Sequence, residues 1–230
     1  MMKLYIRSLY SFVDQVSRNI LQKTIFQLAE EYEQLEFWFV ACRTDFDAIA
    51  IQIIMDLRKQ HPDKQIDIVA ITDPLRYSYT NVEEFPEEDY RFPFHSITKL
   101  QAAPLIQGKC EQYQDRYLTH LNKIEKWIID QCDIILAFYY EDIPSPLAFE
   151  MQRLKKEKMV IPVFNPDIAK ELLIQMDQLD ERPRSILLNL KEGRTYTSIA
   201  KELNVSVSRV RQQAYTSIRS IFREVGKHYI

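Results

Sequence analysis

The sequence predicts an α/β domain with a parallel sheet, followed by a small all-α domain. From residue 3 to residue 164, short apolar runs typical of strands alternate with segments whose apolar residues recur at helical spacing. Beyond Asn165-Pro166 the helical spacing continues and no strand pattern occurs. Charge divides similarly: residues 1–178 carry 20 Lys+Arg against 28 Asp+Glu, and residues 179–230 carry 10 against 5. We therefore expect domains at residues 1–165 and 166–230.

Predicted strands and helices alternate along the first domain. A strand, helix, strand order favours parallel pairing through right-handed crossovers. The apolar run EFWFVAC, bounded by charged residues, is typical of a strand buried on both faces. Strands are predicted at residues 3–7, 36–42, 65–72, 133–139 and 159–164, and helices at residues 12–32, 45–60, 117–131 and 146–158.

Two segments carry more detailed expectations. The apolar side of the first helix is expected to contain Val13, Val16, Ile20 and Leu28. Residues 73–107 contain four prolines and an acidic cluster among many aromatic residues. This composition favours an irregular excursion with weak structure.

The second domain is predicted to be a compact four-helix unit. Residues 167–179 and 182–190 have helical spacing, and Gly193 is expected to end the second of these helices. Residues 195–223 then have the pattern of a helix-turn-helix.

N-caps and a turn residue define this helix-turn-helix pattern. Thr195 and Ser206 are good N-caps for a short and a longer helix, and Asn204 suits the tight turn between them. The buried sides are expected to hold Ile199, Ala200 and Leu203 in the first helix and Val210, Ile218 and Phe222 in the second. The outward positions hold Ser208, Arg209, Arg211, Gln212 and Arg219.

The outward residues have chemistry suited to DNA. Arginine can bond guanine bidentately and glutamine can bond adenine, while serine and further arginines bond phosphates. A capped helix N-terminus also favours an anion. The alternative is an ordinary helical hairpin with a solvated charged face. A basic tail on an acidic body favours the first interpretation, since only the tail would meet a polyanion.

At these residues the sequence resembles region 4 of the sigma-70 family. The resemblance covers roughly the last fifty residues, and its most specific part is the run RVRQ at residues 209–212, preceded by Asn204-Val205-Ser206. It implies base contacts from Val207, Ser208, Arg211 and Gln212, with Thr195 near a phosphate. Val207 and Ser208 stand where the housekeeping members usually have Arg and Glu.

The first domain resembles the SLOG superfamily, nearest to its YpsA-like branch. The resemblance covers about residues 2–164 and is carried by VACRTDFDAIAIQIIMDLRKQHPDKQIDIVAIT and KWIIDQCDIILAFYYEDIPSPLAFEMQRLKKEKMVIPVF. It implies a Rossmann-like parallel sheet that binds nucleotides or related small ligands through glycine loops.

The implied ligand site lacks the family's glycines. Cys42 and Asp45 occupy glycine positions, and a carboxylate at position 45 should repel a phosphate that bare amides would accept. The ligand is therefore expected to have been lost or changed. The candidate ligand-binding residues are Ser8, Cys42, Asp45, Asp47, Ser145 and Glu150.

Composition and spacing argue against several other classes of protein. Three cysteines without CxxC spacing indicate neither a disulfide framework nor a zinc site, and four scattered histidines form no metal-binding or catalytic motif. We expect no catalytic residues, metal or cofactor. No apolar run approaches the length of a membrane span, so the cytoplasm is the simplest compartment.

The sequence favours a bacterial-type, sequence-specific DNA-binding transcription regulator. Its body would sense a ligand or dimerise, because a single small helix-turn-helix usually needs a second contact with double-stranded DNA. Three alternatives stay open: a nucleotide-binding or nucleotide-processing enzyme with an accessory tail, a DNA-processing protein, and a module that contacts RNA polymerase.

Overall fold

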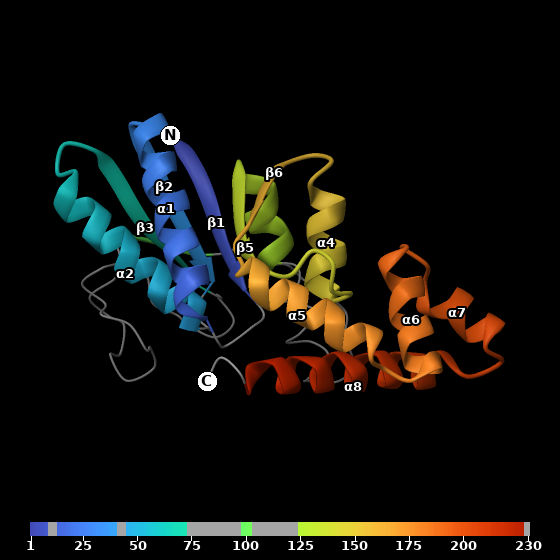
Figure 1. Ribbon diagram of the computed structural model, residues 1–230. Helices are drawn as coiled ribbons and strands as arrows, with labels where there is room; N and C mark the ends of the chain where they lie inside the picture. Colours follow the sequence, from blue (N-terminus) through green and yellow to red (C-terminus); the bar gives the residue numbers. More distant parts are fainter. Residues whose placement is uncertain (9–12, 41–44, 73–97, 103–123, 228–230) are drawn as a thin grey trace. The chain divides into compact units, whose positions relative to one another are not determined.

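A parallel sheet organises the N-terminal part of the structure, a computed structural model that describes residues 1–8, 13–40, 45–72, 98–102 and 124–227 (Figure 1). The spatial order of the strands is β4-β3-β2-β1-β5-β6, and β1 to β5 pair in parallel. The predicted α/β class with a parallel sheet is thereby confirmed. The strands are β1 (Met2–Ser8), β2 (Gln34–Val40), β3 (Gln65–Thr72), β4 (Lys99–Ala102), β5 (Ile134–Phe138) and β6 (Met159–Pro162).

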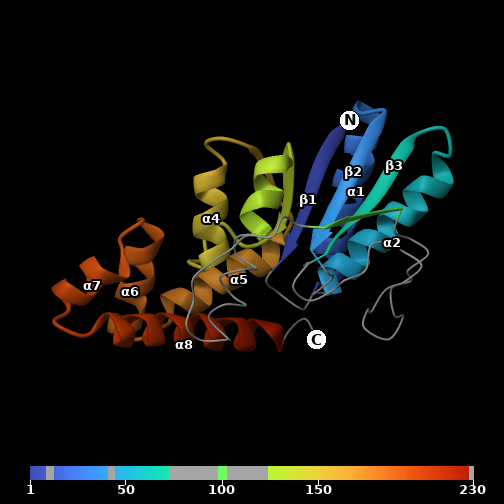
Figure 2. The same cartoon turned by 180° about the vertical axis from the view of Figure 1, so that it is seen from behind.

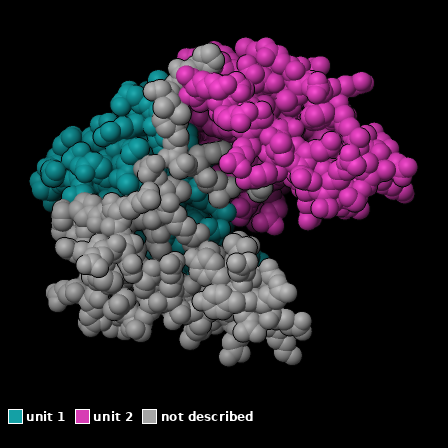
Figure 3. All heavy atoms as spheres, turned by 90° about the horizontal axis from the view of Figure 1, so that it is seen from below, with its two compact units in different colours: residues 1–138, 158–161 teal, residues 139–157, 162–230 magenta. Residues whose placement is uncertain are grey.

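Contacts divide the chain into two compact units, coloured separately in Figure 3. The first comprises residues 1–138 and 158–161, and the second comprises residues 139–157 and 162–230. The expected domain boundary after residue 165 lies within the second unit. It stays a prediction, because compactness alone does not show which segments form a domain.

Helices lie on both faces of the sheet (Figures 1 and 2). Side chains alternate between the faces of a strand, and the strand register places Trp38 and Phe138 on opposite faces. On one face, Phe46 of α2 (Asp45–Gln60) stacks on Phe138 with ring centroids 5.2 Å apart. On the other, Trp127 in the helical residues 124–131 lies 5.9 Å from Trp38. Aromatic packing therefore holds a helix against each face.

The buried side of α1 (Gln15–Glu31) differs from the prediction. Val16 is 45% exposed, whereas the polar Ser17 is buried. The helix begins after Asp14, whose carboxylate accepts hydrogen bonds from the N–H of Val16 at 3.0 Å and of Ser17 at 3.1 Å. The Ser17 hydroxyl also donates to Asp14, so its burial leaves no unmet bond. The buried residues are Ser17, Leu21, Ile25, Leu28 and Ala29.

Strand β4 was not expected, and the prediction of weak structure is wrong for residues 99–102. Residues 73–97 and 103–107 of the excursion lie outside the described residues, whereas Thr98 is described. Thr98 starts the pairing, because its N–H donates to the Ile68 carbonyl at 3.0 Å and its hydroxyl accepts from the Ile68 N–H at 2.9 Å. Such a short strand depends on backbone bonds, so apolar alternation does not reveal it.

Three charged side chains link the edge strand β4 to its neighbour β3 and to β2, the next strand in the sheet. Glu36 and Asp67 are register partners on β2 and β3, where like charges repel. The Lys99 ammonium lies 2.7 Å from a Glu36 oxygen and 2.8 Å from an Asp67 oxygen. Glu36, only 5% exposed, also accepts a hydrogen bond from the Trp38 indole at 3.1 Å. The positive charge of Lys99 therefore offsets the repulsion between the Glu36 and Asp67 carboxylates.

The protonation equilibria of Asp67 and Lys99 follow from the geometry of the triad. Burial opposes ionisation of Asp67, but hydrogen bonds from Lys99, Thr98 and Gln65 outweigh burial and lower the pKa of Asp67. Hydrogen bonds to Asp67 and Glu36 raise the pKa of Lys99. A carboxyl group whose pKa is lowered in the folded state stabilises the fold at pH values above its unfolded-state pKa, and this stabilisation is lost as the pH falls through the folded-state pKa. An ammonium group whose pKa is raised stabilises the fold until the pH rises to alkaline values. The triad thus stabilises the fold around neutral pH.

Replacing Lys99 by Met should lower the free energy of unfolding by about 2 kcal/mol at neutral pH, because Glu36 and Asp67 would face each other unpaired. Urea unfolding at about pH 7 and about pH 3 measures the loss, which should shrink in acid as the Asp67 carboxyl group takes up a proton.

The matched control is Lys59→Met. Lys59 lies 3.1 Å from Asp56 in an exposed pair on α2, so its loss should cost no more than about 0.5 kcal/mol. Equal losses in the two variants, or a Lys99→Met loss that is independent of pH, would contradict the role assigned to the triad.

The described part of the second unit consists mainly of helices. Asn165 caps α5 by accepting a hydrogen bond from the Asp167 N–H at 3.0 Å. Gly193 ends α6 as predicted, with φ of 83°. Among the described residues, no helix has both the length and the apolar character of a membrane span. The helices are α4 (Pro146–Leu154), α5 (Pro166–Asp177), α6 (Glu181–Lys191), α7 (Tyr196–Glu202) and α8 (Val207–Gly226).

The long helix α8 packs against α5, α6 and α7 (Figure 1). Val210 is buried as predicted, but Ile218 and Phe222 are only half-buried. Small side chains at Ala214 and Ser217 occupy the centre of the buried face and let the neighbouring helices approach closely. The buried residues are Val210, Ala214, Ser217, Ile221 and Val225.

An aromatic cluster joins residues 139–145 to α8 within the second unit. The buried Tyr140 ring lies 5.7 Å from Phe164 and 5.6 Å from Phe222, in tilted arrangements. Nearby in sequence, Asp142 forms an ion pair with Lys191 of α6 at 3.0 Å. The segment that follows β5 is therefore fixed to two of the C-terminal helices.

Candidate nucleic-acid interface

Side-chain caps start both α7 and α8, as predicted. The Thr195 hydroxyl accepts a hydrogen bond from the Ser198 N–H at 3.1 Å, and the Ser206 hydroxyl accepts one from the Arg209 N–H at 3.2 Å. Each capping hydroxyl thus accepts a hydrogen bond from one of the backbone N–H groups that have no partner in the first helical turn. The remaining N–H groups and the helix dipole favour an anion at these ends.

The turn between α7 and α8 has a defined hydrogen-bond pattern. Asn204 has φ of 50°, the left-handed conformation that Asn tolerates better than most residues. The Val205 N–H donates to the Ala200 carbonyl at 3.0 Å and the Asn204 N–H to the Lys201 carbonyl at 3.4 Å. This pair of bonds is a Schellman motif, which fixes the direction in which the chain leaves α7.

The residues predicted to contact DNA lie on the outer side of this segment. Arg211 and Gln212 are exposed on the second turn of α8, and Arg219 is exposed two turns further along. Val207 is half-buried at the start of α8. The other predicted residues are also exposed, namely Thr195, Ser206, Ser208 and Arg209.

Three of the four arginines of α8 have no carboxylate partner within the described part of the chain; the fourth, Arg223, lies 3.9 Å from Glu224. Residues 207–223 include four arginines and no Asp or Glu. Among the described residues, no carboxylate lies within 4.0 Å of Arg209, Arg211 or Arg219, whereas Arg194 pairs with Glu202. Arginines that lack an internal partner keep their hydrogen-bond donors available for an external anion.

Tyr215 belongs to the same surface and was missed by the sequence analysis. It is 68% exposed, four residues after Arg211 and four before Arg219. Residues at this spacing share one side of a helix. The helical spacing itself could have identified it, once the buried side was correctly placed on Ala214 and Ser217.

Arg211 is the one predicted residue for which a described aromatic contact is found. Its guanidinium carbon lies 5.5 Å from the centroid of the Tyr196 ring, within the range of a cation–π interaction. Tyr196 is half-buried at the start of α7. Burial raises the pKa of the Tyr196 hydroxyl, and the positive charge of Arg211 partly opposes this rise. The ring is therefore neutral at physiological pH.

The predicted ligand residues are divided between the two units. Ser8 ends β1, and Asp47 is buried in the first turn of α2. In the second unit, the Ser145 hydroxyl caps α4 by accepting from the Ala148 N–H at 3.0 Å, and Glu150 lies half-buried on α4. Cys42 and the side chain of Asp45 lie outside what the structure describes.

The described members of this set form no metal centre. In that part of the chain, no group of three or more His, Cys, Asp and Glu side chains is placed to hold a metal ion. Ser145 is already engaged as a helix cap, so its hydroxyl has a structural role. A ligand site on the sheet domain stays a prediction.

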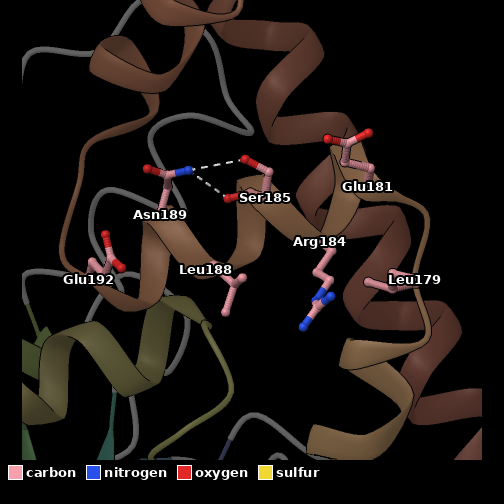
Figure 4. A pocket seen from close by; sticks show the side chains of 7 residues that line it. All are labelled: Leu179, Glu181, Arg184, Ser185, Leu188, Asn189 and Glu192. Atoms are coloured by element: carbon pink, nitrogen blue, oxygen red, sulfur yellow. Dashed lines mark hydrogen bonds between the residues drawn. The ribbon is translucent and has the colours of Figure 1, made fainter.

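A shallow groove of about 630 Å³ runs along the outer side of α6 (Figure 4). Within it, the Asn189 amide donates to the Ser185 carbonyl at 2.7 Å, and Arg184 bonds Asp177 at 2.9 Å. Arg184 and Asn189 therefore already have hydrogen-bond partners within the chain, and none of the predicted site residues lines the groove. Its lining residues are Leu179, Glu181, Arg184, Ser185, Leu188, Asn189 and Glu192.

No protein-family model matches the chain, and no curated protein sequence matches it. The resemblances to the SLOG superfamily and to sigma-70 region 4 therefore rest on the residues quoted above.

Replacing Asn204 by Ala should lower the free energy of unfolding by about 1 kcal/mol, because a Cβ without a polar partner is disfavoured at positive φ. Asn204→Gly should be at least as stable as the wild type at this position. Chemical denaturation of the three proteins measures both effects. Equal stability of the Ala and Gly variants would show that the turn does not hold this conformation in solution.

Proposed function

We propose that the protein is a sequence-specific DNA-binding transcription regulator whose α7 and α8 form a helix-turn-helix. In this proposal α8 enters the major groove of double-stranded DNA, and α7 lies across the sugar-phosphate backbone. The resemblance to sigma-70 region 4 supports the proposal, since it covers the same residues.

The observation that carries the proposal is the outer surface of α8. Arg209, Arg211 and Arg219 have no carboxylate partner among the described residues, and Gln212 and Tyr215 lie exposed beside them. An ordinary solvated helix more often mixes both charge signs, which stabilise it through pairs three or four residues apart. A one-signed surface without internal pairs fits a polyanion.

Each part of this surface has a suitable role on a duplex. Arg211 can donate two hydrogen bonds to guanine, and the Gln212 amide can bond adenine. Ser206 and Ser208, at the capped start of α8, favour a phosphate together with the free N–H groups of the first turn. Arg219, two turns beyond Arg211, would contact the backbone on one side of the groove.

The acidic body would contribute specificity indirectly. One small helix-turn-helix contacts only a few base pairs, so regulators of this kind usually bind as dimers with two half-sites. We propose that the sheet domain supplies dimerisation, ligand sensing or a contact with RNA polymerase. Because the body is negatively charged, it repels DNA, so DNA would contact only the tail.

Selection of bound fragments from a random duplex library at about physiological salt tests the function. The wild type should enrich a motif, and the variant Arg211→Ala/Gln212→Ala should lose it, because both side chains read base edges in this proposal. The matched control is Gln152→Ala/Arg153→Ala, which removes the same two side-chain types from exposed positions on α4. The control should retain the motif. A wild type that enriches none would refute sequence-specific regulation.

Tyr215→Ala should weaken binding to the selected site about fivefold, since the exposed ring can contact a thymine methyl group or a sugar. Titration of labelled duplex measures the change. Because the ring is exposed, unfolding stability should stay within about 0.5 kcal/mol of the wild type. Unchanged DNA affinity would remove Tyr215 from the interface.

A further inference from the structure

Tyr196 and Arg211 bring the starts of α7 and α8 together on the proposed DNA-contacting side. Tyr196 is the first residue of α7, directly after the Thr195 cap, and Arg211 lies just over one turn into α8. The guanidinium carbon is 5.5 Å from the ring centroid. The ring is half-buried and the arginine is exposed, so the fixed partner is the tyrosine.

The other exposed arginines of α8 have no comparable support among the described residues. Neither Arg209 nor Arg219 has a carboxylate within 4.0 Å or an aromatic ring beneath it in that part of the chain. A free arginine side chain samples many rotamers and loses that freedom when it binds. Arg211 has already lost part of this rotamer freedom, because its guanidinium group contacts the Tyr196 ring.

We propose that Tyr196 is a positioning residue that holds Arg211 in the orientation needed to read a guanine. This inference rests on the proposed function. The ring face attracts the guanidinium plane, and stacking in this way leaves the N–H groups at the edge of the plane free for the guanine O6 and N7 atoms.

The effect should appear in specificity more than in general affinity for DNA. A phosphate is a charge that an arginine can reach from many orientations, whereas a bidentate bond to guanine requires one plane and one direction. Loss of the ring should therefore weaken binding to the selected site and leave binding to unrelated duplex almost unchanged.

A double-mutant cycle on the full chain tests this role. The ratio of affinities for the selected site and an unrelated duplex is measured for the wild type, Tyr196→Leu, Arg211→Ala and the double variant. Tyr196→Leu should reduce the ratio about three- to fivefold, the effect expected of one cation–π contact. The same substitution should leave the ratio unchanged in the Arg211→Ala background. Tyr196→Phe, which keeps the ring, should retain the wild-type ratio.

Two results would overturn the inference while the proposed function stands. If the wild type selects a motif but the two substitutions are additive, Tyr196 acts on the fold and not through Arg211. If Tyr196→Phe loses as much as Tyr196→Leu, the hydroxyl group and not the ring face is responsible. A wild type that selects no motif refutes the proposed function and this inference with it.

A measurement on the free protein keeps the test independent of folding losses in Tyr196→Leu. The Arg211 side-chain N–H resonance should show a ring-current shift in the wild type and in Tyr196→Phe. The Arg209 resonance serves as the internal control, since no described ring lies beneath it. Identical Arg211 and Arg209 shifts in the wild type would show that the contact is absent in solution and overturn the inference.

Discussion

Close packing along one face of α8 is the constraint on which the second unit depends. Ala214 and Ser217 are small enough for three other helices to approach this face, and Val210, Ile221 and Val225 fill the space around them. Because that face is committed to the interior, the arginines have only the opposite side available. The geometry of the core thus fixes which side chains are exposed on the outer side of α8.

Charge is treated in opposite ways in the two units. In the sheet, Lys99 lies between Glu36 and Asp67 and offsets a repulsion that strand pairing creates. On α8, the exposed Arg209 and Arg219 have no such counter-charge among the described residues. The first arrangement stabilises the fold, whereas the unpaired arginines of the second would be stabilised electrostatically by an external anion. This difference is why the arginines of α8, and not the charged triad of the sheet, mark the candidate site.

The sequence predicted the features that depend on local chemistry. Strand β3 and helix α2 lie where the pattern placed them, and Thr195, Ser206 and Asn204 cap and turn the chain as expected. Features that depend on tertiary partners were missed. Strand β4 is held by backbone pairing and by Lys99, and the buried faces of α1 and α8 contain serines that a hydrophobic pattern does not recognise. Of the site, Tyr215 could be placed by helical spacing only with the correct buried face of α8. The contact of Tyr196 with Arg211 required the three-dimensional structure, because aromatic residues in a sequence are most often core.

The packing of Tyr140 between Phe164 and Phe222 makes the second unit discontinuous in the chain. Its two segments are separated by residues 158–161, which belong to the first unit and include the first three residues of β6. A fragment that begins at the predicted boundary would lack Tyr140 and leave the Phe222 ring without this aromatic neighbour. Transfer of the C-terminal helices to another protein would therefore keep this aromatic packing only if the turn after β5 were transferred with them.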